Sequence, residues 1–107
     1  MKVRILTSAC RDLTANQQFY ERQGVDVGEY FLDSVFADID SLALYGGIHR
    51  KVFGFHRLLA KRFPHAIYYR VEDKNTAVVY RILDCRQDPA KTSRALRHAG
   101  KGDSPEY

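Results

Sequence analysis

The alternation of apolar and polar residues divides the first part of the chain into a short strand and a helix. Polar and apolar side chains alternate from Lys2 until Leu6, which is typical of a half-buried strand. A helix is predicted from Ala9 to Gln23, with Thr7 and Ser8 before it as candidate N-caps. Gly24 is placed to end this helix in a left-handed conformation. The apolar stripe of the helix comprises Ala9, Leu13, Phe19 and Tyr20.

A second and clearer helical pattern runs from Val27 to Leu42 and ends at Gly46-Gly47. Its apolar side chains recur at spacings of four, four, four and three, and its polar side carries Glu29, Asp33, Asp38 and Asp40. Because only three residues separate the two helices, they are predicted to form an antiparallel hairpin with a shared apolar face. The apolar side of the second helix is wide enough either to be used fully by the first helix or to receive a partner helix in a groove. The residues expected to receive such a partner are Phe31, Val35, Phe36 and Ile39.

After Gly54 the pattern changes from helical spacing to strands. Segments 55–63, 66–72 and 76–85 are rich in aromatic and β-branched residues at strand length. Pro64-His65 forms the break between the first two, and residues 73–75 form a tight polar turn between the second and third. The order β-α-α-β-β-β predicts an α+β fold, in which an antiparallel sheet is covered on one face by the helix hairpin. We expect the first strand to join this sheet as well.

The last part of the chain becomes polar. Asp88-Pro89 is predicted to start a short helix that runs to about Arg97, with Pro89 at its first position. We therefore expect a single domain over residues 1–97 and a flexible C-terminal tail over residues 98–107.

Length and composition agree with one domain but do not specify a function. The chain has 107 residues, which suits one compact core. Cys10 and Cys85 lack the spacing of a metal site, and no segment resembles a signal peptide or a membrane span. We therefore expect a cytoplasmic protein with reduced thiols and with no metal or cofactor.

Charge is distributed unevenly along the chain. Residues 1–48 contain 4 basic and 7 acidic side chains, a net charge of −3, whereas residues 49–107 contain 13 basic and 6 acidic side chains, a net charge of +7. A basic second half can attract nucleic acid or an acidic protein, or it can be an ordinary solvated surface.

The candidate chemistry lies in the basic strands. Arginines near a histidine and a tyrosine can hold a phosphate and transfer a proton, the chemistry of a metal-independent nuclease. The nuclease candidates are Arg57, Arg62 and Arg86 for the phosphate and His56 or Tyr69 for the proton. The same surface can instead dock a target protein through Arg57, Lys61, Arg62, Arg81 and Arg86.

Four segments in order carry a resemblance to a known superfamily: KVRILTSACRDL, EYFLDSVFADIDSL, RFPHAIYYRVED and VYRILDCRQDP. Over residues 3–90 the chain resembles the RelE/ParE superfamily of type II toxins. The block formed by Phe63, Pro64, Ile67, Tyr68 and Tyr69, and the closing strand through Pro89, look most like the plasmid-stabilisation, ParE-type members.

This resemblance implies a β-α-α-β-β-β domain that is neutralised by an antitoxin wrapped over the hairpin and sheet. RelE-like members cut mRNA at the ribosome, and ParE-like members bind DNA gyrase. Arg86 aligns with a basic residue of the nucleases, but no tyrosine follows it before Tyr107, so the aromatic partner is missing from its expected place. The resemblance therefore favours a gyrase-binding toxin, with a ribosome-dependent mRNA endonuclease or a non-toxic antitoxin-binding module as alternatives. Contact with DNA is expected only through the antitoxin, and none with a membrane.

Overall fold

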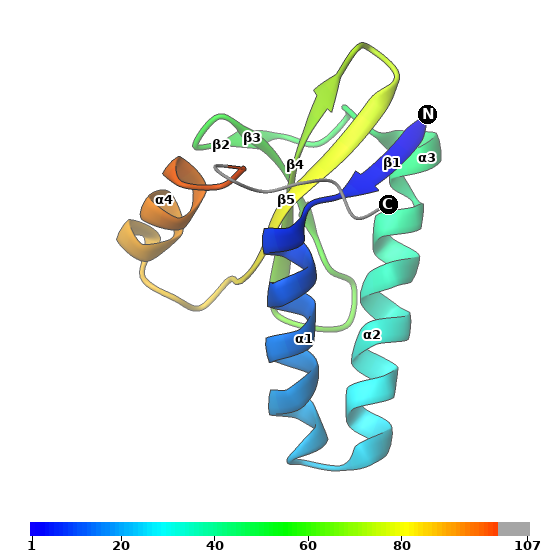
Figure 1. Ribbon diagram of the computed structural model, residues 1–107, viewed down its shortest axis with the longest axis vertical. Helices are drawn as coiled ribbons and strands as arrows, with labels where there is room; N and C mark the ends of the chain where they lie inside the picture. Colours follow the sequence, from blue (N-terminus) through cyan, green and yellow to red (C-terminus); the bar gives the residue numbers. More distant parts are fainter. Residues whose placement is uncertain (101–107) are drawn as a thin grey trace.

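The computed structural model describes residues 1–100, in which a helix hairpin packs against one face of a five-stranded sheet (Figure 1). The predicted α+β class is confirmed, and the elements follow the predicted order with two additions. In chain order they are β1 (Lys2–Ile5), α1 (Thr7–Glu21), α2 (Val25–Asp40), α3 (Leu42–Tyr45), β2 (Lys51–Val52), β3 (Phe55–Leu59), β4 (His65–Glu72), β5 (Thr76–Asp84) and α4 (Pro89–Arg97).

The sheet is mixed rather than wholly antiparallel. Its strands lie in the order β1-β5-β4-β3-β2, and β1 runs parallel to β5 while all other neighbours are antiparallel. The first strand therefore joins the sheet as predicted, but beside the last strand. The two-residue strand β2 was not predicted; it pairs with β3 at the far edge.

The β4–β5 hairpin contains the predicted tight turn and one irregularity. Asp73 and Lys74 have φ values of 57° and 60°, as the two central residues of a type I′ turn require. Farther along, Tyr68 pairs with Arg81 and Tyr69 with Val79, so Tyr80 is an extra residue in β5. Such a bulge changes which residues of the strand face each side of the sheet.

The first helix differs from the prediction at both ends. It begins at Thr7, and Ser8 is not a cap but donates a hydrogen bond from its hydroxyl to the Tyr80 carbonyl at 2.6 Å. Gly24 has a φ of 157° and lies before α2 as its N-cap, so it is not the left-handed end of α1. Phe19 is 47% exposed and lies outside the core.

The main core lies between the hairpin and the sheet. Phe31, Val35 and Ile39 of α2 are fully buried there, against strand residues that include Tyr69 and Val79. This burial gives the hairpin its fixed position, because each large apolar side chain removed from water contributes about 1.5–3 kcal/mol.

The second helix differs from the prediction in its polar side and in its length, as Asp38 and Ser41 show. Asp38 is buried, and its carboxylate accepts the backbone N–H of Lys61 at 3.1 Å. Ser41 donates its hydroxyl to the Asp38 carbonyl at 2.6 Å, and the helix breaks there into α2 and α3.

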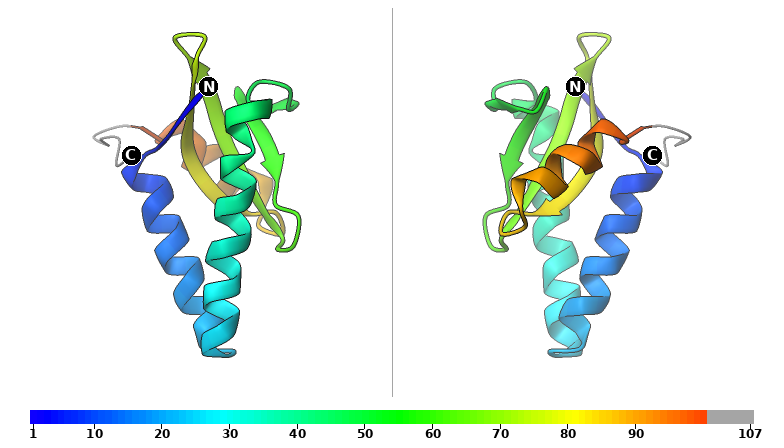
Figure 2. Two further views of the ribbon diagram at one scale, coloured as in Figure 1. Left: turned by 90° about the vertical axis from the view of Figure 1, so that its right-hand side faces the viewer. Right: turned by 90° about the vertical axis from the view of Figure 1, so that its left-hand side faces the viewer.

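A second, smaller core covers part of the opposite face of the sheet. There α4 crosses the sheet on the side away from the hairpin (Figure 2) and packs Leu96 against Phe55, Ala66, Tyr68 and Leu83. The predicted start of α4 is confirmed: Pro89 is its first residue, and the Asp88 carboxylate accepts the Ala90 N–H at 2.9 Å. The sequence predicted a helical cover on one face of the sheet only, whereas α4 covers part of the other face as well.

The predicted boundary between domain and tail falls at the end of α4. Residues 98–100 continue as a turn, with Ala99 against the second core. The remainder of the predicted tail, residues 101–107, lies outside the described residues.

Candidate partner-binding surfaces

The residues predicted for a nuclease site lie on both faces of the sheet. His56 pairs with Tyr69 across the β3–β4 ladder, and the adjacent pair is Arg57 with Tyr68. Because successive side chains of a strand point to opposite faces, Arg57 lies on the α4 side and the other two lie on the hairpin side. The structure thus brings His56 and Tyr69 together but not with Arg57.

Tyr69 and His56 hold the loop before β2 against the sheet. The buried Tyr69 hydroxyl accepts the Gly47 N–H at 2.9 Å and is hydrogen-bonded to Nδ1 of His49. The His56 ring stacks on Tyr69 with centroids 5.0 Å apart, and its Nδ1 donates to the His49 carbonyl at 2.5 Å. Burial raises the pKa of Tyr69, which makes its phenol a poorer proton donor. These contacts give both side chains a structural role.

Arg81 is held by α1. Its Nε and Nη2 bond the two carboxylate oxygens of Asp12 at 2.7 and 2.9 Å, and both side chains are largely buried. The same Asp12 carboxylate accepts the Ile82 N–H at 2.9 Å. This predicted target-binding arginine is therefore already committed to an internal carboxylate.

Three of the predicted cations remain accessible at one end of the sheet. Lys61 and Arg62 are exposed in the β3–β4 loop, and the Pro64 carbonyl of that loop accepts the Cys85 N–H at 2.8 Å, next to Arg86. Arg86 is exposed and pairs with Asp84 at 2.7 Å; its hydrogen bonds lower the pKa of Asp84 to about 2. This region, which we call the cationic end, consists of Lys61, Arg62 and Arg86.

His65 was predicted in a turn but is the first residue of β4 and is buried among aromatic rings. Its Nε2 lies 3.4 Å from the Tyr20 hydroxyl, and Phe31 packs edge-on against its ring. Burial lowers the pKa of His65, so the ring is neutral near pH 7. Its position within the core leaves no space for a substrate.

Of the four residues predicted to bind a partner on the hairpin, only Phe36 reaches the surface. Phe31, Val35 and Ile39 belong to the core. Phe36 is half-buried beside Leu32, and the two line a hollow of about 150 Å³ between α1 and α2 with Cys10, Leu13, Thr14 and Gln17. We call this hollow the hairpin groove.

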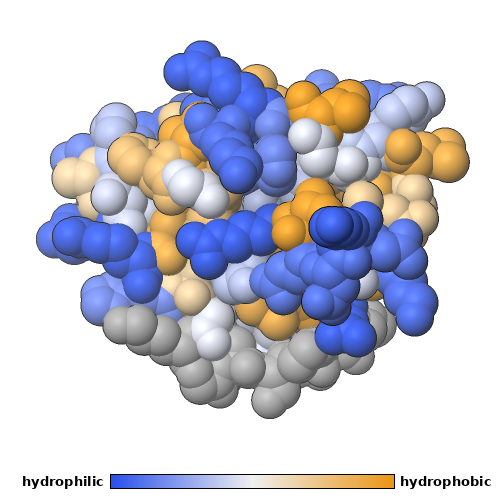
Figure 3. Space-filling model, turned by 90° about the horizontal axis from the view of Figure 1, so that it is seen from above, coloured by the Kyte–Doolittle hydropathy of each residue, from blue (hydrophilic) through white to orange (hydrophobic). Residues whose placement is uncertain are grey.

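Sequence reasoning missed an exposed apolar group on α3 and the loop that follows it. Leu44 is 82% and Ile48 73% exposed, and Tyr45 is exposed between them. The end of the molecule that carries α3 shows separate hydrophobic patches among hydrophilic side chains (Figure 3). The sequence contained one signal of this exposure. Leu44 lies two residues after Leu42 and so falls outside the three- and four-residue spacing of the buried apolar side.

Neither a metal site nor a membrane-spanning helix is found within residues 1–100. No group of three His, Cys, Asp or Glu side chains in this range could hold a metal ion. None of its helices is both long and apolar enough to cross a bilayer.

Comparison with known proteins adds the family. A family model described as the ParE toxin of the type II toxin–antitoxin system, parDE, matches residues 3–89. A solved structure titled "Chromosomal ParDE TA system from P. aeruginosa" is similar in fold, with a TM-score of 0.69 and 21% sequence identity over 78% of this chain and 95% of that chain. No curated protein matches the sequence. The family match spans the hairpin, all of the sheet except the first residue of β1, and the start of α4, and the chain therefore belongs to the ParE toxin family of type II toxin–antitoxin systems.

Proposed function

We propose that this protein is the toxin of a type II toxin–antitoxin pair, is neutralised by a protein antitoxin, and acts by binding DNA gyrase. The family assignment supports the toxin–antitoxin part, and the similar structure is of a ParDE system. The observation that favours binding over RNA cleavage is the division of the nuclease candidates between the two faces of the sheet.

RNA cleavage without a metal needs a proton donor or acceptor close to the residues that hold the phosphate. Tyr69 is buried, with its hydroxyl bonded to the loop before β2, and His56 stacks upon it. The arginines Arg62 and Arg86 lie beside the Pro64–Cys85 contact, at the opening of β4 and the close of β5. The cationic end therefore offers charge for recognition, while His56 and Tyr69, the predicted proton carriers, are engaged with the loop before β2.

The antitoxin is proposed to occupy the hairpin groove. A helix or strand laid along α1 and α2 would cover the half-buried Leu32 and Phe36 and exclude water from them. The cationic end is proposed to meet the acidic surface of the target, where paired charges speed association and set its orientation.

The test uses purified protein in a gyrase supercoiling assay and expression of the chain without antitoxin in a bacterium. We expect inhibition of supercoiling and induction of the DNA-damage response. The variant Lys61→Glu/Arg62→Glu should weaken inhibition by about tenfold or more, because it reverses two exposed charges. Its matched control is Arg22→Glu/Lys74→Glu, which reverses two exposed cations in turns elsewhere and should inhibit like the unaltered chain.

Two results would contradict the proposal. Cleaved mRNA with normal gyrase activity would show that the protein is a ribosome-dependent endonuclease. Harmless expression of the folded chain would show a non-toxic antitoxin-binding module.

A further inference from the structure

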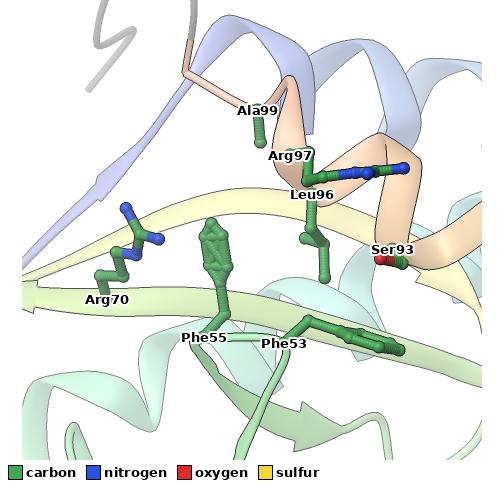
Figure 4. A pocket seen from close by; sticks show the side chains of 7 residues that line it. All are labelled: Phe53, Phe55, Arg70, Ser93, Leu96, Arg97 and Ala99. Carbon is green, nitrogen blue, oxygen red and sulfur yellow. The ribbon is translucent and has the colours of Figure 1, made fainter.

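The face of the sheet that carries α4 also contains a groove between this helix and the β2–β3 turn. Its larger cavity measures about 310 Å³ and has an apolar wall of Phe53, Phe55, Leu96 and Ala99 (Figure 4). A smaller cavity of about 100 Å³ shares Phe53 and extends toward Arg57. We call the two cavities together the α4 groove; they lie across the sheet from the hairpin groove.

Charge in the α4 groove is positive. Arg70 and Arg97 line the larger cavity, and no acidic side chain is among the described residues that line it. Neither arginine forms an ion pair with any carboxylate within residues 1–100. The smaller cavity adds Arg57 and one acid, Asp84, which is already paired with Arg86. The groove therefore offers guanidinium groups that no carboxylate of residues 1–100 pairs with, and a carboxylate is the partner that a guanidinium prefers.

Arg70 is held in place by two aromatic rings. Its guanidinium carbon lies 3.9 Å from the centroid of the Phe55 ring and 5.4 Å from that of Tyr80. Stacking on an aromatic ring leaves the edge of a guanidinium able to donate several hydrogen bonds, of which Arg70 directs one toward the Tyr80 side chain. In the close view Arg70 and Arg97 lie on different sides of the cavity, with Leu96 projecting from α4 toward the two phenylalanines between them (Figure 4).

Phe53 adds an independent observation. Its φ is 54° and that of Gly54 is 82°, so the pair forms a turn whose first position suits Asn or Gly. A phenylalanine there is strained, and the residue is 50% exposed although it forms part of an apolar wall. Neither turn formation nor core packing accounts for an aromatic ring at this position, whereas a role in the wall of a binding groove does.

We propose that the α4 groove binds an extended acidic segment of a partner protein. A leucine or phenylalanine of that segment enters the larger cavity between Phe53 and Leu96, and neighbouring Asp or Glu side chains pair with Arg70 and Arg97. A peptide fits better than a nucleic acid, because nucleic acids gain affinity from rows of cations along successive phosphates. Here two cations flank an aliphatic and aromatic wall. The proposal concerns a different surface from the hairpin groove and does not depend on the identity of the target.

The experiment uses the full chain and a fluorescent, unstructured peptide with a central Leu-Phe pair flanked by Asp and Glu. Fluorescence anisotropy should show saturable binding that weakens as salt is added. The same peptide with Lys in place of each acid should not bind. A single-stranded oligothymidylate should bind no more tightly than the acidic peptide. In ¹⁵N NMR spectra the acidic peptide should shift the amides of Phe53, Arg70 and Arg97 but not those of α1.

Two variants separate binding from folding. Phe53→Asn removes the ring and suits the positive φ, so it should weaken binding by about tenfold while the melting temperature stays the same or rises. Arg97→Gln should also weaken binding about tenfold, whereas Arg94→Gln, an exposed position on the same helix outside the groove, should leave it unchanged.

Absence of binding by the acidic peptide, equal binding of the basic peptide, or tighter binding of the oligonucleotide would each overturn the proposal. Unchanged affinity in Phe53→Asn would do the same. None of these outcomes bears on gyrase inhibition, which is measured without the peptide.

Discussion

Asp12 accepts a backbone hydrogen bond from the part of β5 that has no neighbouring strand on the β1 side. β1 ends at Ile5, opposite Val79, so the residues of β5 beyond that point have no strand on this side. The Asp12 carboxylate accepts the Ile82 N–H there and holds the Arg81 guanidinium by two further bonds. One side chain of α1 thus satisfies both a backbone donor and a charge.

Asp12→Ala is expected to lower the free energy of unfolding by about 2 kcal/mol. The change leaves the Ile82 N–H and a largely buried guanidinium without their acceptor. Urea unfolding measures the effect. Asp33→Ala, at an exposed carboxylate of α2, is the control and should change stability by less than about 0.5 kcal/mol. Equal effects from the two substitutions would refute the role of Asp12.

Stability should fall as the pH falls from about 7.5 to about 5.5. Burial lowers the pKa of His65 and of His49, for which His56 adds a smaller repulsion. The unfolded chain therefore takes up protons at these positions near its pKa of about 6.5, before the folded chain does, and the loss is complete once the pH is below the folded values. Urea unfolding of His65→Phe should depend less on pH in this range. His98→Gln, at an exposed histidine, should behave like the unaltered chain.

The faces on which strand residues lie could be predicted from the sequence, but their long-range partners could not. Adjacent residues of a strand face opposite sides, so the separation of His56 from Arg57 follows from the pattern once β3 is recognised. The partner of Arg81 does not, because Asp12 is 69 residues away along the chain. Phe36 could not be distinguished from its buried neighbours, since burial on a wide apolar helix depends on how another helix lies against it.

At the level of elements, local patterns predicted the hairpin, β4, β5 and α4. Each has either a helical spacing or a turn signal within a few residues, such as residues 73–75 before β5. The parallel pairing of β1 with β5 has no such signal, because the chain between them contains every other strand. β2 is too short for its pattern to differ from a loop, and the break at Ser41 coincides with a side-chain bond to the Asp38 carbonyl that the apolar spacing does not reveal.

Asp88→Ala tests whether α4 depends on its cap. Loss of the bond to the Ala90 N–H should destabilise the helix by about 1 kcal/mol, which corresponds to about fivefold faster amide exchange in α4 if the helix opens on its own. Hydrogen exchange followed by NMR gives the measurement. Exchange in β4 should not change, and an equal acceleration there would mean that α4 opens only with the whole domain.

The whole molecule presents two separate grooves, one on each side of the sheet. The hairpin extends past the sheet and α4 lies against the opposite face (Figures 1 and 2). Each side has its own core, with Phe31 and Tyr69 in one and Phe55 and Leu96 in the other. A partner in the hairpin groove would therefore leave the α4 groove accessible.

Phe36→Glu should separate neutralisation from toxicity. A charge in the hairpin groove would have to be buried when the proposed antitoxin binds, so affinity for the antitoxin should fall by about a hundredfold or more. Inhibition of gyrase should remain. Calorimetry with the purified antitoxin measures the first effect, and Leu59→Glu, at an exposed apolar residue of β3, is the control. Antitoxin affinity that falls equally in both variants would place the antitoxin elsewhere.

The pairing of β1 with β5 also determines when the protein can acquire its structure during synthesis. Lys2 lies opposite Thr76, so during synthesis β1 remains without this neighbour until β5 has emerged from the ribosome. The shared core of hairpin and sheet is complete only after β5 is in place, since Val79 and Ile82 belong to it. A nascent or prematurely terminated chain that ends before β5 therefore lacks this core, and any binding that depends on the folded domain begins only once β5 has been made.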